Sequence, residues 1–162
     1  MEEEGRGAEV KMASLLRHPN IIEINDIGVL TSGRPFIAME YLEGRTLNEQ
    51  LRDDGRLSPE EALDVLEPVC SALEAAHAAG IIHRDVKASN ILVVRGAPPT
   101  IKLLDFGIAK LLRPDADFPA LTSIGRQIGT PTIMAPEQLL GWAIDARVDV
   151  YALGILLYRL LT

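Results

Sequence analysis

The sequence predicts a domain of the α+β class, with short strands near its start and helices over much of the remainder. Two β-prone runs, 21–30 and 35–41, flank the turn-forming residues 31–34, which is the pattern of an antiparallel hairpin. A segment at 58–80 carries apolar residues at helical spacing behind a capping sequence. The almost entirely apolar segment 145–162 closes the chain as a second long helix.

The first element is expected to be a helix that precedes the hairpin. Residues 6–17 place Val10, Ala13 and Leu16 at helical spacing. The helix should end at His18-Pro19-Asn20, because the residue before a proline disfavours helical backbone.

Two further helices are predicted between the hairpin and the middle of the chain. Residues 46–54 form a short helix that stops before a glycine. The longer helix starts after Ser58, which can act as the cap. Pro59 then takes the first helical position, and Glu61 can reach back to complete a capping box. This helix is expected to end at Gly80.

Beyond the long helix the pattern changes to short β-prone pieces and an irregular stretch. Strands are predicted at 91–94 and 100–104, separated by the Gly-Ala-Pro-Pro turn at 96–99. Residues 113–135 show no convincing periodicity, which is typical of a functional or mobile loop. Because the segment 145–162 is apolar all round, we expect it to be buried on every side.

Composition narrows the class of protein. The 162 residues fit one domain, and 48% hydrophobic with 24% charged residues is typical of a globular chain. A formal charge of −7 argues against nucleic acid as a partner. The single Cys70 excludes an intrachain disulfide and suits the cytoplasm. We expect no membrane contact within this segment, because its start is acidic and its apolar runs are short. A membrane anchor in a longer parent protein stays open.

Three short motifs carry the chemistry. His83–Asn90 fits the pattern H-R-D-x-x-x-x-N, and Asp105-Phe106-Gly107 and Ala135-Pro136-Glu137 follow it. The first motif alone has a chance frequency of about 10⁻³ in a chain of this length. In this order the three motifs resemble those of the protein kinase family, and in particular the eukaryotic-like serine/threonine kinases of bacteria.

The resemblance implies a protein-kinase-like fold that is only partly contained in residues 1–162. Residues 1–41 would be a remnant of the N-lobe, with one helix and one β-hairpin. Residues 42–162 would be the hinge and the mainly helical first half of the C-lobe. The 162 residues contain no G-x-G-x-x-G run and no strand lysine to hold phosphates, so we expect this polypeptide alone to show no appreciable phosphotransfer.

The resemblance also implies a catalytic set that uses ATP and Mg²⁺. Asp85 would accept the proton of the substrate hydroxyl, and Lys87 would contact the transferred phosphate. Asn90 and Asp105 would hold Mg²⁺ through hard oxygen atoms. Thr130 would hydrogen-bond Asp85 and Lys87. Taken singly, these residues would be read as turn-forming, loop or surface residues.

The nucleotide's adenine would lie at the hinge. The resemblance places Met39 at the gatekeeper position, Glu40 and Leu42 at the backbone positions that bond adenine, and Leu92 beneath it. Glu9 would be the helix glutamate that pairs with the strand lysine. The plain alternatives are a core-facing methionine and leucine and, for Glu9, an exposed helix carboxylate.

Regulation would involve Arg84, which precedes Asp85 in the pattern of kinases that are switched by loop phosphorylation. Thr122 and Ser123 are the candidate phosphate acceptors, or else polar loop residues without that role.

Four residues are expected to be structural. His83 would be a packed histidine that stacks with Phe106, and Asp149 would be a buried carboxylate that accepts backbone N–H groups near His83 and Arg84. Glu137 would lack the arginine with which the family pairs it.

Two functional hypotheses remain after these assignments. The first is an enzyme: part of a kinase that phosphorylates Ser or Thr hydroxyls of protein substrates. The alternative is a catalytically inactive kinase remnant that acts as a protein-binding module. Under either hypothesis, exposed core surface should promote self-association.

Overall fold

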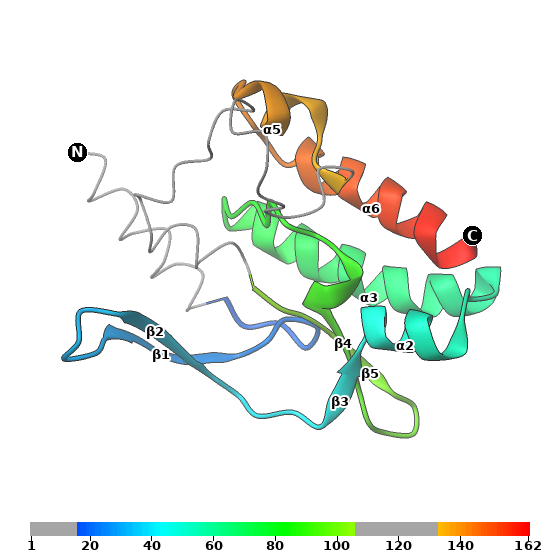
Figure 1. Ribbon diagram of the computed structural model, residues 1–162, viewed down its shortest axis with the longest axis horizontal. Helices are drawn as coiled ribbons and strands as arrows, with labels where there is room; N and C mark the ends of the chain where they lie inside the picture. The colour runs from blue at the N-terminus through cyan, green and yellow to red at the C-terminus, as the bar shows by residue number, and fades with distance from the viewer. Residues whose placement is uncertain (1–15, 106–132) are drawn as a thin grey trace.

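The computed structural model of the protein describes residues 16–105 and 133–162. Within these residues the strands lie along one side of the molecule and most of the helices along the other (Figure 1). The α+β class predicted from the sequence is therefore confirmed.

The predicted hairpin is present, within narrower bounds. Strand β1 (Ile24–Val29) pairs antiparallel with β2 (Pro35–Met39). The N–H of Leu30 donates to the carbonyl of Arg34 at 2.8 Å and closes the turn between them.

A second, three-stranded antiparallel sheet joins the hinge region to the middle of the chain. It has the order β3 (Gly44–Thr46), β4 (Ile91–Val94) and β5 (Thr100–Leu103). β4 and β5 were predicted; β3 was not, because three residues are too few to show alternation. A Cβ atom at Gly44 would lie 2.4 Å from the carbonyl oxygen of Val93, so only glycine allows this close pairing.

The two helices predicted between the hairpin and the middle of the chain are also confirmed. Helix α2 (Leu47–Asp54) follows Thr46, whose side chain caps it. Helix α3 (Pro59–Ala78) begins with the predicted capping box, in which the N–H of Glu61 donates to Ser58 Oγ at 3.2 Å. In return Glu61 Oε2 accepts the N–H of Ser58 at 2.8 Å. These bonds satisfy backbone donors that helix starts otherwise leave open.

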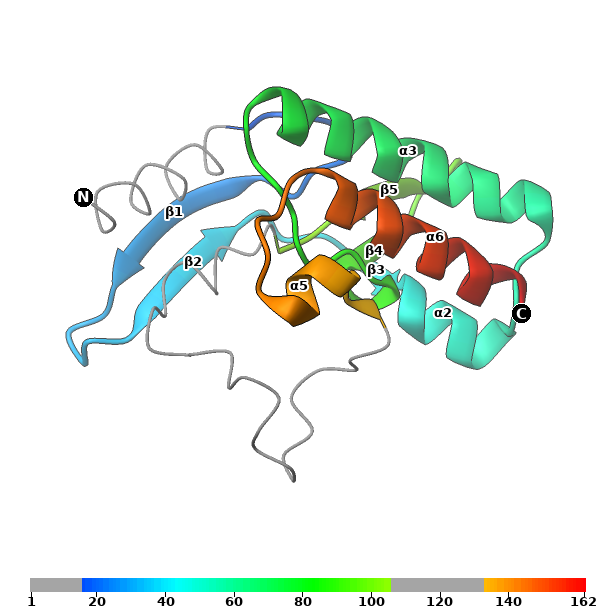
Figure 2. The same cartoon turned by 90° about the horizontal axis from the view of Figure 1, so that it is seen from above.

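The core lies between α3, the second sheet and the last helix, α6 (Arg147–Leu161). Helix α6 runs beside α3 in both views (Figures 1 and 2). The largest apolar side chains that are completely buried come from different elements. They are Leu47, Ile91, Leu103 and Leu160.

Helix α6 corrects the prediction of burial on every side. Its buried apolar residues fall four apart along one face, whereas Val150 is 62% and Tyr158 is 69% exposed. The reason is that the described neighbours of α6 cover only one of its faces. Among the described residues no helix, α6 included, is long and apolar enough to cross a bilayer.

The prediction of a helix over residues 6–17 is wrong at its C-terminal end. Residues 16–18 have no helical structure, and the remainder of the predicted helix lies outside the described residues. Asn20 instead ties this segment to β5, because its Nδ2 donates to the carbonyl of Ile101 at 2.9 Å. Its own carbonyl accepts the N–H of Leu103 at 2.7 Å.

Candidate functional site

Lys87 and Asn90 converge on the carboxylate of Asp85. Lys87 Nζ donates to Asp85 Oδ2 at 2.8 Å, and Asn90 Nδ2 donates to the same oxygen at 3.1 Å. Asn90 Nδ2 also donates to the backbone carbonyl of Asp85 at 2.9 Å. A short 3₁₀ turn, η1 (Ala88–Asn90), brings Asn90 back toward Asp85. The three residues thus form one charged, hydrogen-bonded cluster, which the plain reading of each as a separate loop residue does not explain.

Asp149 accepts hydrogen bonds from the backbone of the residues that precede Asp85. The N–H of His83 donates to Asp149 Oδ2 at 2.9 Å, and the N–H of Arg84 donates to Oδ1 at 2.8 Å. The Asp149 residue is completely buried, so these bonds offset the cost of removing its charge from water. The predicted contact is therefore present.

The structure adds a partner of Asp149 that was not predicted. His77 Nε2 lies 2.7 Å from Asp149 Oδ2. His77 is in the last turn of α3 and 72 positions away from Asp149. No local sequence signal connects residues so far apart.

His83 is buried, and both of its ring nitrogens lie within hydrogen-bond distance of backbone groups. Its Nδ1 accepts the N–H of Asp85 at 3.2 Å, which requires the proton to be on Nε2, and Nε2 lies 2.8 Å from the carbonyl of Leu104. Burial lowers the pKa of His83 below its ordinary value of 6.5. The hydrogen bond to Leu104 and the charges of nearby carboxylates oppose this shift without cancelling it. We infer that the ring is neutral and fixed in one tautomer at pH 7.

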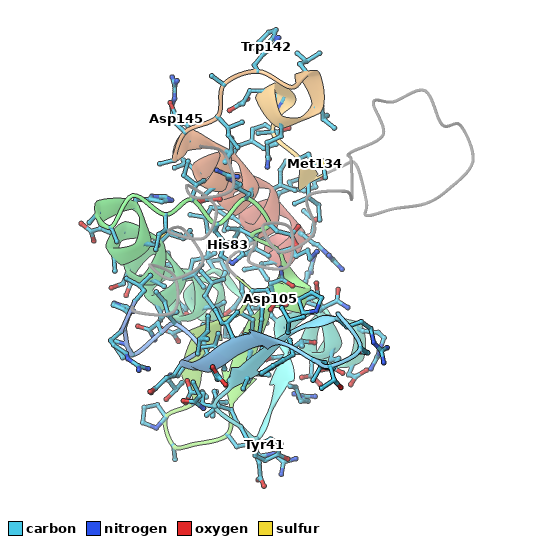
Figure 3. The ribbon with its side chains drawn as sticks, turned by 90° about the vertical axis from the view of Figure 1, so that its left-hand side faces the viewer. Tyr41, His83, Asp105, Met134, Trp142 and Asp145 are labelled. Carbon is cyan, nitrogen blue, oxygen red and sulfur yellow. The ribbon has the colours of Figure 1, made fainter. Side chains whose placement is uncertain are left out.

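Asn90 and Asp105 are brought together by the backbone. The N–H of Leu104 donates to the carbonyl of Asn90 at 2.8 Å, so Asp105 follows directly on the residue bonded to Asn90. Asp105 is exposed and adopts a φ of 53°. Asp105 also follows directly on Leu104, whose carbonyl lies 2.8 Å from Nε2 of the buried His83. Figure 3 labels both residues between the helices and the strands.

The donor atoms of this pair fit a hard divalent cation. A carboxylate and an amide oxygen suit Mg²⁺, which is usually bound by one or two protein oxygens together with phosphate and water. Within the described residues no group of three or more His, Cys, Asp or Glu side chains could hold a metal ion by itself. Asn90 and Asp105 offer two oxygen donors, and a phosphate-bearing ligand and water would fill the remaining positions.

The hinge region is tied to β5 by an ion pair. Glu40 Oε1 accepts from Lys102 Nζ at 2.7 Å and from the N–H of Glu23 at 2.9 Å. Burial by itself raises the pKa of Glu40, but the hydrogen bonds from Lys102 and Glu23 outweigh it, and the pKa lies below 4.5. The Glu40 side chain is thus a fixed anion that joins the end of the hairpin to the strand leading to Asp105.

The other predicted hinge residues are more exposed than residues that face the core would be. Met39 is 41% exposed, which contradicts the alternative of a core-facing methionine. Leu42 and Leu92 are half-buried. Leu92 lies opposite Thr46 across the β3–β4 pair, so the strand that carries it adjoins the end of the hinge.

Several predicted site residues lie outside the described residues. They are Glu9, Phe106, Thr122, Ser123 and Thr130. Glu137 is described: it is half-buried in helix α5 (Pro136–Leu140). The charge of Glu137 helps to raise the pKa of Arg147, after the larger effect of Asp145, so an arginine lies near Glu137 among the described residues.

The sequence of the chain matches a known family. The model of the protein kinase domain matches residues 1–162. The chain belongs to the protein kinase family. Among its relatives, the serine/threonine-protein kinase Pkn3 of Myxococcus xanthus is 46% identical over 156 residues, which are 95% of this chain and 28% of Pkn3. The serine/threonine-protein kinase PknB of Mycobacterium leprae (strain TN) is 40% identical over 157 residues, or 95% of this chain and 24% of PknB.

Solved kinase structures confirm the protein-kinase-like fold. A crystal structure of a cysteine-to-alanine mutant of the PknI kinase domain of Mycobacterium tuberculosis superposes with a TM-score of 0.78 at 30% identity. The match covers 99% of this chain and 57% of the PknI chain. This kinase chain therefore spans just over half of that domain and about a quarter of the length of Pkn3 and PknB.

Proposed function

We propose that this chain supplies the catalytic loop of a protein serine/threonine kinase, which transfers the γ-phosphoryl group of ATP to Ser or Thr hydroxyls of proteins. The observation that carries the proposal is the convergence of Lys87 and Asn90 on the Asp85 carboxylate. The names of the kinase relatives support the choice of acceptor.

In this proposal Asp85 receives the proton of the substrate hydroxyl. The hydroxyl oxygen forms a bond to the γ-phosphorus while the bond from that phosphorus to the β–γ bridging oxygen breaks, and ADP leaves. Lys87, 2.8 Å from Asp85, places a positive charge where the phosphoryl group passes. Asn90 and Asp105 would hold Mg²⁺ bound to the nucleotide phosphates.

The hinge would hold the adenine through backbone groups of Glu40 and Leu42. The N–H of Glu40 already donates to the carbonyl of Glu23 at 2.9 Å, so Glu40 would contribute its carbonyl. Met39 and Leu92 would contact the ring. The remaining roles are those that the family resemblance implies. Glu9 would pair with a strand lysine, and Thr130 would hydrogen-bond Asp85 and Lys87. Arg84 would pair with a phosphate on Thr122 or Ser123.

Activity is best tested in a hybrid kinase, because residues 1–162 contain no glycine-rich loop and the chain alone is expected to be inactive. The hybrid replaces the matched segment of Pkn3 with this chain and is assayed with a protein substrate. We expect phosphorylation of Ser or Thr, and Asp85→Asn should lower kcat by about 10²- to 10⁴-fold through loss of the base.

The matched control for this assay is Ser89→Ala. Ser89 lies in the same loop but is exposed, so its removal should leave kcat within about twofold, as expected for a surface change away from the cluster. A folded hybrid without phosphotransfer, or an Asp85→Asn hybrid at the unsubstituted rate, would contradict the proposed function.

A second candidate function, protein binding, is favoured by the apolar surface near α5 and α6. Trp142 is 66% exposed and points outward at one end of the molecule (Figure 3). Val150 and Tyr158 are exposed on one face of α6, two turns apart. An uncovered apolar face of this kind favours association.

We expect the isolated chain to self-associate through this face at micromolar concentrations. The double variant Val150→Lys, Tyr158→Glu places charges on the face without touching buried residues, so it should sediment as a monomer. The control Val29→Lys alters an equally exposed residue, at 67%, on the distant hairpin. Sedimentation velocity that shows a monomer for the unsubstituted chain, or association in both variants alike, would rule out this surface.

A further inference from the structure

Gln138 on α5 joins that helix to the catalytic loop through a single side-chain amide. Its Oε1 accepts the N–H of Ala135 at 3.0 Å, which satisfies a donor at the start of α5. Its Nε2 donates to the backbone carbonyl of Arg84 at 3.1 Å. Both polar ends of the amide are therefore used, one within α5 and one across 54 positions of sequence.

The carbonyl that Gln138 holds belongs to an unusual stretch of backbone. Arg84 has a φ of 66°, in the left-handed region that residues other than glycine rarely adopt. Its N–H is held by Asp149 Oδ1 at 2.8 Å, and its carbonyl is held by Gln138. Each of the two peptide groups that flank Arg84 is thus bonded to a side chain from a different helix.

This arrangement fixes the peptide group that leads into Asp85. The carbonyl of Arg84 and the N–H of Asp85 belong to the same planar unit, so a bond to one orients the other. The Asp85 N–H donates to His83 Nδ1 at 3.2 Å. Rotation of this peptide plane would turn the Asp85 backbone and displace the carboxylate that it carries.

We propose that Gln138 is a positioning residue that sets the orientation of Asp85 by holding the Arg84–Asp85 peptide, and so couples α5 to phosphoryl transfer. Its influence on the reaction rests on the proposed function. The contact requires a side chain with a donor and an acceptor on one group, and glutamine has the length to use both.

Two substitutions distinguish the hydrogen bond of Gln138 to the Arg84 carbonyl from its hydrogen bond to the Ala135 N–H. Gln138→Glu keeps an oxygen to accept from Ala135 but has no donor for the Arg84 carbonyl, and it faces that carbonyl with a negative charge. Gln138→Met keeps the length and loses both bonds. The matched control is Leu140→Ala, because Leu140 is on the same helix and 58% exposed.

The first measurement is amide hydrogen exchange by NMR on the 162-residue chain that also carries Val150→Lys and Tyr158→Glu, which should keep it monomeric. Gln138→Glu should speed exchange at the amides of Arg84 and Asp85 by about tenfold, as expected when a partly buried hydrogen bond is lost. Exchange at Ala135 should stay within about twofold of the unsubstituted chain, and in Gln138→Met all three amides should exchange faster. Unchanged exchange at Arg84 and Asp85 in Gln138→Glu would overturn the inference.

The second measurement is steady-state kinetics in the hybrid kinase. Gln138→Glu should lower kcat by about tenfold while the KM for ATP stays within about twofold, because Gln138 acts on Asp85 and not on the nucleotide. A rise in KM with unchanged kcat would overturn the positioning role. An unsubstituted hybrid that is folded but inactive would contradict the proposed function instead, and the exchange measurement would still decide whether Gln138 holds the loop.

Discussion

Replacing Asp149 with alanine is expected to lower the free energy of unfolding by roughly 2 to 6 kcal/mol. The substitution leaves the N–H groups of His83 and Arg84 without the carboxylate that accepts them at 2.9 and 2.8 Å. Each backbone donor that is left unsatisfied costs about 1 to 3 kcal/mol. The contact with His77 at 2.7 Å is lost as well. We also expect the loop to lose order, with faster amide exchange at His83 and Arg84.

Urea unfolding of the isolated chain, together with amide exchange, tests this prediction. The control is Asp145→Ala, a carboxylate just before α6 whose side chain is 57% exposed and pairs with Arg147 at the surface. Exposed ion pairs contribute about 0 to 1 kcal/mol, and Asp145 Oδ1 also accepts the N–H of Arg147 at 2.9 Å at the exposed start of α6. This variant should therefore lose less stability than Asp149→Ala and leave amide exchange at His83 and Arg84 unchanged. A loss of less than 1 kcal/mol in Asp149→Ala, or unchanged exchange at both loop amides, would show that Asp149 does not hold the loop.

The elements that the sequence predicted well are those set by local chemistry. The capping box of Ser58 and Glu61 involves residues three positions apart, so its pattern is visible in the sequence and the bonds form as expected. The contact of Asp149 with the loop spans 66 and 65 positions. It could be predicted only because three motifs resemble those of a family in which a buried aspartate occupies this place.

The features that were missed or wrong depend on the packing of distant elements. Gln138 and His77 reach partners 54 and 72 positions away, and neither lies in a motif that marks it as functional. The burial of α6 was overestimated because apolar content alone does not show which faces have neighbours. Val150 is apolar and 62% exposed for this reason.

The second large effect concerns pH and follows from the buried, neutral His83. Because burial holds its pKa below 6.5 in the folded state, the unfolded chain binds a proton at a higher pH than the folded chain does. Stability from this group is therefore complete above about pH 6.5 and is lost as the pH falls below that value. The loss approaches about 1.4 kcal/mol per pH unit and levels off once the pH is below the folded-state pKa.

The variant His83→Phe should remove this part of the pH dependence, because phenylalanine has no proton to bind. It should also be less stable near pH 7, since the contact with Leu104 and the acceptor for the Asp85 N–H are both lost. Val86→Ala is the matched control: Val86 is completely buried in the same loop, and its truncation should lower stability by a similar amount at every pH.

Urea unfolding between pH 7.5 and 5 distinguishes the two behaviours. If His83→Phe and the unsubstituted chain lose stability in parallel over this range, His83 is not the group that makes the fold sensitive to acid. This result would contradict the inference that His83 is neutral in the folded chain, and with it the assignment of Nδ1 as the acceptor of the Asp85 N–H.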